Sequence, residues 1–402
     1  MSDTSRQLRD LLDAAVGDPP HTVTVQAVRR RVARRRIIES VAAVLVAVLV
    51  AGVGVAVATQ AHGSGVANGP RPAAGAPRYY VQQQFGTGPA ASTVVRATAT
   101  GKVTATVRCQ PGTSLVQRAI AAATRRTFFL ACQTHTGPRG KQVITGSRIY
   151  RFHLTAAGRI AGYSLVPGGS LGGLSAGEVT AAANGSEIAV GTLPAGHVSP
   201  SESADIMVIN TRTGARAVWH SSPAVPGKMA LAAGDLSLTA DGRELVYLGT
   251  PRCIAGHCQP TGNGQEVRAL RPAAAGGQLS SSRLLVRQAT LGRLASTYLD
   301  GAVVSADGSS VDVLKMLSPG QGPTTVSVIK VSAATGRPVR VLYRVTTGNG
   351  FSFQTFSSDP SRGYLILVAG PPGGTIPNGY IYHRHLVPLA PADGSNVSYE
   401  TW

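Results

Sequence analysis

Beyond about residue 78, short apolar runs alternate with turn-forming residues along the rest of the chain. The runs are 5–8 residues long, are rich in Val, Ile, Leu, Tyr and Thr, and show almost no helical periodicity. Runs of this kind, bounded by Gly, Asn, Asp and Ser, are typical of β-strands joined by tight turns. The pattern therefore predicts an all-β domain over residues 78–402.

Two kinds of strand pair recur in this domain. In the first kind a small or acidic turn separates the strands, and it occurs at 119–132, 178–193, 235–250, 302–317 and 353–370. In the second kind a Thr-Gly or Ala-Gly turn joins them, and it occurs at 93–107, 148–165, 204–220 and 325–343. The Asp or Asn of successive first turns falls at 184, 241, 307 and 359, so the spacings are 57, 66 and 52 residues.

A four-stranded unit that repeats in this way is typical of a β-propeller with somewhat extended loops. We expect about six blades, the first of which lacks a clear inner strand. Strands from the two ends of the domain would then pair to close the ring. A pair of β-sandwiches is the alternative architecture that the same alternation allows.

The turn S/T-x-D-G followed by an apolar strand is the most regular motif of the repeat. Its best copies are Leu238-Thr239-Ala240-Asp241-Gly242 and Val304-Ser305-Ala306-Asp307-Gly308. This motif resembles the repeats of TolB-like β-propellers. The resemblance implies the propeller fold and specifies no activity.

The repeat also predicts which connections share a face of the propeller. If the strands of a blade are named a to d, the D-G turns join a to b and the T-G turns join c to d. Because antiparallel strands alternate in direction, both turns lie on one face and the b–c connections lie on the other. Those connections are long, at 133–147, 194–203, 250–264 and 371–378, and they carry His135, His197 and His257. Since long loops on a rigid scaffold often form binding sites, we expect this to be the recognition face.

An apolar segment precedes the domain. Residues 41–58 contain no polar side chain, and an arginine-rich stretch at 29–36 comes immediately before them. About 20 apolar residues in a helix cross a bilayer, and arginines stay on the cytoplasmic side. We therefore expect a cytoplasmic basic tail (1–40), a transmembrane helix (41–59), a flexible linker (60–77) and an extracytoplasmic propeller (78–402). The alternative is a cleaved signal peptide, which usually has a shorter apolar core nearer the N-terminus.

The chain is strongly basic, with 38 Lys+Arg against 19 Asp+Glu and a net charge of +19. Arginine dominates over lysine, which indicates the codon bias of a high-GC bacterial genome. The charge does not condense into a basic helix or stripe along the sequence, so we expect no nucleic-acid partner. Attraction to anionic lipid headgroups or acidic wall polymers is the partner chemistry that such a basic ectodomain favours.

All four cysteines follow the apolar segment, which fits an oxidising compartment. We expect the disulfides Cys109–Cys132 and Cys253–Cys258. His257 lies between the second pair, so a metal site is the alternative there. Zinc motifs usually combine two such pairs or add spaced histidines, and neither occurs here.

Catalytic motifs are weak. Gly168-Gly169-Ser170-Leu171-Gly172 matches the nucleophile elbow G-x-S-x-G, but strand sequence follows it where the elbow requires a helix, and we expect a flexible glycine-rich loop. His383 and His385 share one face of a strand without a third metal ligand. We therefore expect no catalytic residue, no metal and no cofactor, and we interpret the chain as a protein that is not an enzyme.

Three functions remain to be compared. The first is a single-pass membrane protein that displays the propeller as a binding or scaffolding module and possesses the architecture of a transmembrane regulator. Its partner outside would be a protein or an envelope polymer, and a cytosolic protein would bind the tail through Leu8, Leu11 and Leu12. The second is an exported propeller hydrolase, and the third is a structural protein that binds anionic wall polymer.

Overall fold

The computed structural model describes 15 stretches of the chain, and every structural statement below concerns these residues. They are 76–84, 92–109, 113–137, 143–196, 205–221, 229–253, 264–272, 275–292, 297–317, 323–347, 352–358, 365–370, 379–382, 385–388 and 397–401. The expected tail and transmembrane helix, and almost all of the expected linker, lie outside the described residues. Within the described part of the chain, no helix has the length and apolar character needed to cross a membrane.

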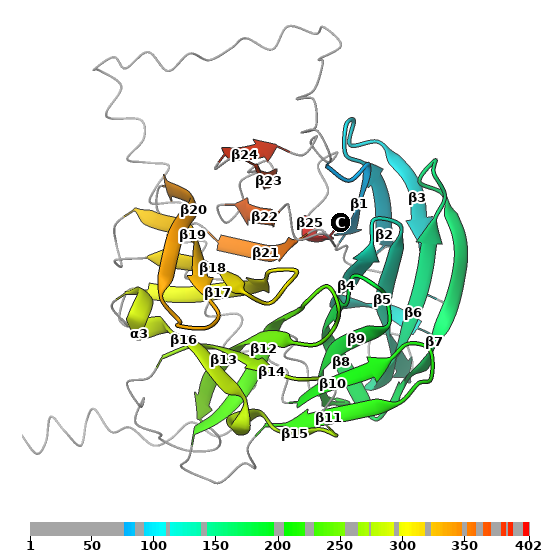
Figure 1. The fold of residues 1–402 in the computed structure, drawn as a ribbon. Helices are drawn as coiled ribbons and strands as arrows, with labels where there is room; N and C mark the ends of the chain where they lie inside the picture. Colours follow the sequence, from blue (N-terminus) through cyan, green and yellow to red (C-terminus); the bar gives the residue numbers. More distant parts are fainter. Residues whose placement is uncertain are drawn as a thin grey trace, which may run out of the picture. The chain divides into compact units, whose positions relative to one another are not determined.

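The described residues form six antiparallel sheets in a propeller arrangement, as the sequence predicts (Figure 1). We number these sheets blades 1 to 6. From the innermost strand outward, blade 1 consists of β25 (Val397–Thr401), β1 (Tyr79–Gln84), β2 (Ser92–Ala97) and β3 (Val103–Val107). Blade 2 consists of β4 (Thr113–Thr124), β5 (Thr127–Thr136), β6 (Val143–Leu154) and β7 (Ile160–Gly172). Blade 3 consists of β8 (Leu174–Ala181), β9 (Glu187–Pro194), β10 (Asp205–Asn210) and β11 (Arg216–His220).

Blades 4 to 6 follow the same order. Blade 4 consists of β12 (Met229–Leu238), β13 (Leu245–Cys253), β14 (Glu266–Leu270) and β16 (Arg283–Arg287). Blade 5 consists of β17 (Thr297–Val304), β18 (Ser310–Leu317), β19 (Thr324–Ser332) and β20 (Pro338–Thr347). Blade 6 consists of β21 (Ser352–Ser358), β22 (Leu365–Gly370), β23 (Gly379–Tyr382) and β24 (His385–Pro388). The described helices are short: η1 (Leu279–Ser281) and α3 (Gln288–Leu291).

The ring closes through the C-terminal strand. Strand β25 pairs antiparallel with β1, with Val81 opposite Thr401 and Gln83 opposite Tyr399, and so becomes the missing inner strand of blade 1 (Figure 1). It also contacts β21 of blade 6 and β4 of blade 2. The expectation that strands from both ends of the domain close the ring is confirmed.

Apolar side chains fill the space between successive blades. One cluster joins blades 1 and 2 around Val81, Val95 and Phe128, and another joins blades 4 and 5 around Val246 and Val313. Similar clusters lie between blades 2 and 3, 3 and 4, and 5 and 6. Because successive residues of a strand point to opposite faces, one inner strand can contribute to two of these cores, as β17 does through Val303 and Val304.

The predicted turns have one shared geometry. In blade 5 the Asp307 carboxylate accepts hydrogen bonds from the Ser305 hydroxyl at 2.7 Å and from the Ser309 N–H at 3.0 Å. In blade 3 Asn184 takes the place of the aspartate and accepts from the N–H and the hydroxyl of Ser186. The following glycine adopts a positive φ, 74° at Gly308, a conformation that side chains with a Cβ rarely adopt.

These turns define the two faces of the propeller. The a–b turns (125–126, 182–186, 239–244 and 305–309) and the c–d turns (98–102, 155–159, 211–215 and 333–337) lie on one face, which we call the turn face. The b–c and d–a connections lie on the opposite face, which we call the loop face. The sequence prediction that both turn types share a face is confirmed by the strand order.

Blade 4 departs from the repeat, because no tight turn joins its c and d strands. The connection instead forms β15 (Gly277–Gln278), which pairs in parallel with β11 of blade 3, with Gly277 opposite Trp219. The Tyr247 hydroxyl lies within 3.0 Å of the Leu279 carbonyl and donates to it, which holds the connection over the core. The pairing of β15 with β11 adds a fifth strand to blade 3.

Removal of the C-terminal strand should open the ring. A chain ending at residue 396 leaves the inner edge of β1 unpaired and separates blade 6 from blade 2. We expect its thermal midpoint to fall by about 10 °C or more, since a loss of several kcal/mol has that effect in a domain of this size. Circular dichroism melting measures it. A chain with a short tag after residue 402 should melt as the wild type, and a peptide of residues 397–402 should restore part of the loss.

The D-G turn of blade 5 should contribute stability that depends on pH. Hydrogen bonds from Ser305 and Ser309 lower the pKa of Asp307 to about 2. A carboxyl with a lowered pKa stabilises the fold fully above its unfolded pKa of about 4, and this contribution is lost as pH falls toward 2. Asp307→Ala should therefore lower the urea midpoint at pH 7, and its difference from the wild type should shrink between pH 4 and pH 2.

The matched control for this turn is Asp307→Asn. Because Asn184 makes the same contacts in blade 3, an amide oxygen should replace the carboxylate with a much smaller change in the urea midpoint. Equal midpoints for Asp307→Ala and the wild type at pH 7 would contradict this account of the turn.

Candidate binding face

The two faces of the propeller differ in the length of their connections. On the turn face, β4 and β5 are separated by two residues, and β17 and β18 by five. On the loop face, β9 ends at Pro194 and β10 begins at Asp205, and β13 ends at Cys253 while β14 begins at Glu266. The exception on the turn face is the c–d connection of blade 4, at 271–282, which is as long as the loop-face connection at 254–265. Most of the long connections between described strands therefore lie on the loop face, where they can vary independently of the scaffold.

Polar side chains tie blades 2 and 3 together beside the loop face. The Gln133 amide nitrogen donates to the Ser175 hydroxyl at 3.1 Å, and the Ala176 N–H donates to the Ser147 hydroxyl at 2.9 Å. Ser147 and Ser175 are both buried. These contacts fix the strand ends from which the loops emerge, so the base of this face is rigid.

His135 is the one candidate histidine of the recognition face whose side chain the structure describes. It lies near the end of β5, opposite Ile144, and is half-buried. Burial lowers the pKa of its imidazole below the usual 6.5, so the ring is neutral at pH 7. A neutral imidazole can donate or accept a hydrogen bond or bind a metal ion. His197 and His257 lie outside the described residues, so their convergence with His135 stays a prediction.

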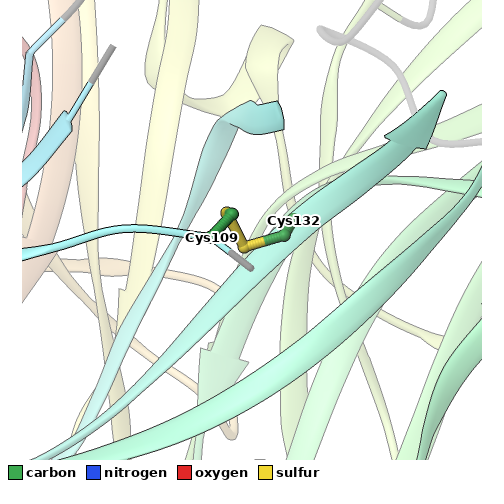
Figure 2. Close-up of a disulfide and its surroundings, with 2 residues drawn as sticks. All are labelled: Cys109 and Cys132. Carbon is green, nitrogen blue, oxygen red and sulfur yellow. A yellow bond between two sulfur atoms is a disulfide. The ribbon is translucent and has the colours of Figure 1, made fainter. Parts of the chain in front are cut away.

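The predicted disulfide between Cys109 and Cys132 is present (Figure 2). Cys109 follows β3 of blade 1 and Cys132 lies in β5 of blade 2, and their Cα atoms are 6.0 Å apart. Cys132 is fully buried in the core between these blades. The bond therefore joins the outermost strand of one blade to the next blade on the side of the loop face.

For the second predicted cysteine pair the structure describes no side chains. Cys253 ends β13, but its side chain lies outside the described part, as do Cys258 and His383. His385 begins β24, and its side chain is likewise outside the description. Among the side chains that the structure describes, no three of His, Cys, Asp and Glu gather where they could hold a metal ion. The Cys253–Cys258 disulfide stays a prediction.

The glycine-rich run around Ser170 is a strand, so the expectation of a flexible loop there is wrong. Strand β7 continues to Gly172, and Ser170 lies opposite Arg148 of β6. The glycines serve close packing, because a Cβ at Gly168, where φ is 70°, would collide with the backbone of Gly214 in blade 3. A strand at this position also excludes the strand–turn–helix geometry of a nucleophile elbow.

A buried ionic cluster near the loop face of blade 4 was not found from the sequence. The Glu266 carboxylate pairs with Arg268 at 2.8 Å and with Arg287 at 3.6 Å, and Arg268 also donates to the Ser282 carbonyl. The Glu266 side chain is only 10% exposed. The only indication in the sequence is that Glu266 and Arg268 are two residues apart and so share one face of a strand. Such pairs are common on strand surfaces and do not by themselves indicate a buried cluster. The cluster holds the outer strands of the blade.

Comparisons with known proteins show no family for this chain. No family model matches the chain, and no curated protein matches it. Similar solved structures include TolB from Acinetobacter baumannii, which is 13% identical with a TM-score of 0.47, over 80% of this chain and 65% of that one. A Mycobacterium tuberculosis puromycin-hydrolyzing peptidase is 14% identical with a TM-score of 0.43, over 79% and 46%. Prolyl oligopeptidase B from Galerina marginata is 8% identical with a TM-score of 0.41, over 81% and 41%.

These comparisons correct one sequence interpretation. The statement that the chain is not an enzyme is wrong as an exclusion, because the chains with a similar fold include prolyl oligopeptidases and dipeptidyl peptidases. The present chain spans 65% of the TolB chain and less than half of the two peptidases named above. A propeller scaffold and a propeller hydrolase are both compatible with this fold.

The Cys109–Cys132 disulfide should stabilise the propeller measurably. The two residues are 23 apart in sequence, and closing a loop of that length in the unfolded chain corresponds to about 3 kcal/mol. Cys109→Ala with Cys132→Ala should therefore lower the urea midpoint under oxidising conditions. A reductant should lower the wild-type midpoint to that of the double variant and leave the variant almost unchanged. Equal midpoints for both proteins without reductant would contradict this assignment.

Proposed function

We propose that the chain is a single-pass membrane protein of the cell envelope whose propeller lies outside the cytoplasm and binds its partner at the loop face. The partner is a protein or an envelope polymer. The propeller supplies a rigid scaffold, and the loops between its b and c strands supply the recognition surface.

The disulfide supports the proposed compartment. Cys109 and Cys132 join two blades through a buried bond, and such bonds persist in oxidising compartments and are rare in the cytosol. The apolar run at 41–58 and the arginines before it support an anchor with its N-terminus in the cytoplasm. Together these features favour export of the propeller with retention at the membrane.

The asymmetry between the two faces is the observation that carries the binding proposal. Apart from 271–282 in blade 4, the described turn-face connections are short. Internal hydrogen bonds hold them, as at Asp241, which accepts from the Arg243 N–H at 3.0 Å and from the Thr239 hydroxyl at 2.8 Å. The loop face includes long connections, at 195–204 and 254–265, and strand ends on this face are tied together, as at Gln133 and Ser175. Variable loops on a fixed base are the arrangement from which binding sites are commonly built.

Protease protection in spheroplasts tests the proposed topology. With an epitope tag at the N-terminus, protease added outside should degrade the propeller and leave a small tagged fragment that contains the tail. A cytoplasmic protein of similar size serves as the control for intact membranes. A propeller that resists protease in spheroplasts and is cut only after lysis would contradict the proposed location.

Photo-crosslinking in living cells tests which face binds. A photoreactive amino acid is placed at Thr136 or Ala289, both exposed on the loop-face side, and at Thr213 or Ala334, both exposed in turn-face turns. We expect a discrete crosslinked protein or polymer product from the first two positions and none of that product from the other two. The reverse distribution would assign recognition to the turn face and overturn the proposal.

A further inference from the structure

Basic residues occupy one repeated position on the turn face. In four turns the glycine with positive φ is followed directly by Lys or Arg, and φ is 67°, 73°, 77° and 65° at Gly101, Gly158, Gly242 and Gly336. All four of the basic residues are exposed: Lys102, Arg159, Arg243 and Arg337. The repeat therefore places charges that are far apart in the sequence on the same face of the propeller.

The excess charge concentrates in blades 1 to 3. Residues 78–177 contain twelve Lys and Arg and no Asp or Glu. The turn-face turns of this stretch and of blade 3 expose five basic side chains, which we call the basic sector: Lys102, Arg125, Arg126, Arg159 and Arg212. Within the described part of the chain, none of these five side chains forms an ion pair.

The turn face of blades 4 and 5 is different, because two of its arginines are paired with acids. Arg243 pairs with Asp241 at 3.3 Å, and Arg283 pairs with Glu244 at 2.5 Å. The basic sector faces a single described acid on its own turns, Glu187, which is half-buried and whose pKa is raised by burial and by Asp241. Arg337 in blade 5 is exposed and forms no ion pair within the described residues, so unpaired positive charge is most concentrated in the basic sector without being confined to it.

The chain also enters the propeller on this face. Strand β1 is a b strand, so it begins at the turn face, and the residues just before it are fixed there. The Thr98 N–H donates to the Arg78 carbonyl at 2.8 Å, and the Thr98 hydroxyl donates to the Pro77 carbonyl at 2.7 Å. Thr98 belongs to the same turn as Lys102. The connection from the proposed anchor thus reaches the propeller beside the basic sector.

We propose that the basic sector docks the propeller onto the anionic phosphate headgroups of the membrane that holds the anchor. This inference rests on the proposed anchoring of the chain. A stretch of the length of residues 60–77 can span at most about 60 Å, so the proposed anchor limits how far the turn face can move from the bilayer. Docking in this orientation directs the loop face away from the membrane, where a partner can reach it.

The attachment point favours lipid over a wall polymer as the source of the phosphates. A tether that ends beside the basic sector raises the effective concentration of headgroups for this surface and for no other. Each basic residue near an anionic membrane strengthens binding about fivefold, so removal of three should weaken docking on the order of a hundredfold. The attraction extends only about 8 Å at physiological salt, so docking requires close approach.

Energy transfer in lipid nanodiscs tests the docking with the full chain. A donor dye is attached through a click-reactive amino acid at Ala99, which is exposed in the blade 1 turn, and the acceptor is carried by lipid headgroups. We expect higher transfer in discs containing phosphatidylglycerol than in discs of phosphatidylcholine alone, with loss of the difference at high salt. The same dye at Ala289 on α3 should show low transfer in both discs.

Matched variants separate docking from net charge. Lys102→Gln, Arg125→Gln and Arg159→Gln together should abolish the lipid-dependent transfer at Ala99. Arg108→Gln, Arg148→Gln and Arg344→Gln remove three exposed charges outside the turn-face turns and should retain it. Equal losses in both triple variants, or equal transfer in the two kinds of disc, would overturn the proposal. Binding of soluble polyphosphate through the basic sector without lipid-dependent transfer would also overturn it.

Failure of the anchor is recorded by a separate measurement. Flotation of the full chain with neutral phosphatidylcholine vesicles at high salt reports insertion without any contribution from the basic sector. A chain that floats but shows no lipid-dependent transfer keeps the anchor and loses the docking. A chain that does not float contradicts the proposed anchor. Energy transfer with the anionic discs then tests by itself whether the basic sector binds anionic headgroups.

Discussion

The pairing of β25 with β1 is the interaction on which the whole propeller depends. Apolar cores join the successive blades from blade 1 to blade 6, and β25 makes the contact that brings blade 6 back to blade 1. Strand β25 supplies the inner edge of blade 1 and contacts both β21 and β4. The first and last strands of the domain are therefore held together by main-chain hydrogen bonds, and the propeller is stabilised by a contact of the greatest sequence separation it contains.

A second constraint is the geometry of the glycine turns, because it divides the surface into two faces with different properties. The turn requires positive φ at residues such as Gly242 and Gly308, and Asp or Asn before them accepts the local N–H groups. Tight turns of this kind leave no room for insertions, so most of the long connections lie on the loop face. Blade 4 is the exception, because its long turn-face connection at 271–282 replaces the tight turn. Basic residues occupy exposed positions next to several of these glycines, as at Lys102 and Arg159.

The proposals assign one task to each face. The turn face receives the chain from the anchor and holds the unpaired arginines, and the loop face holds the long connections. The Cys109–Cys132 bond joins blades 1 and 2 on the side of the loop face and would keep these blades together if docking forces act on the opposite face. The buried pair of Glu266 and Arg268 has a comparable structural role in blade 4, where the glutamate is satisfied by two arginines and does not contribute free charge.

The sequence by itself determined the strands, the turns, the division into blades and the first disulfide, because these follow from local alternation, turn chemistry and the order of strands. Only the tertiary structure decided which distant residues meet: that β7 continues through Gly168 against Gly214, that β15 joins blade 3, and that Glu266 lies between two arginines. The basic sector belongs to this second group. Its charges are scattered between residues 102 and 212, and the ring gathers them on one face because each blade repeats the same turn at the same place.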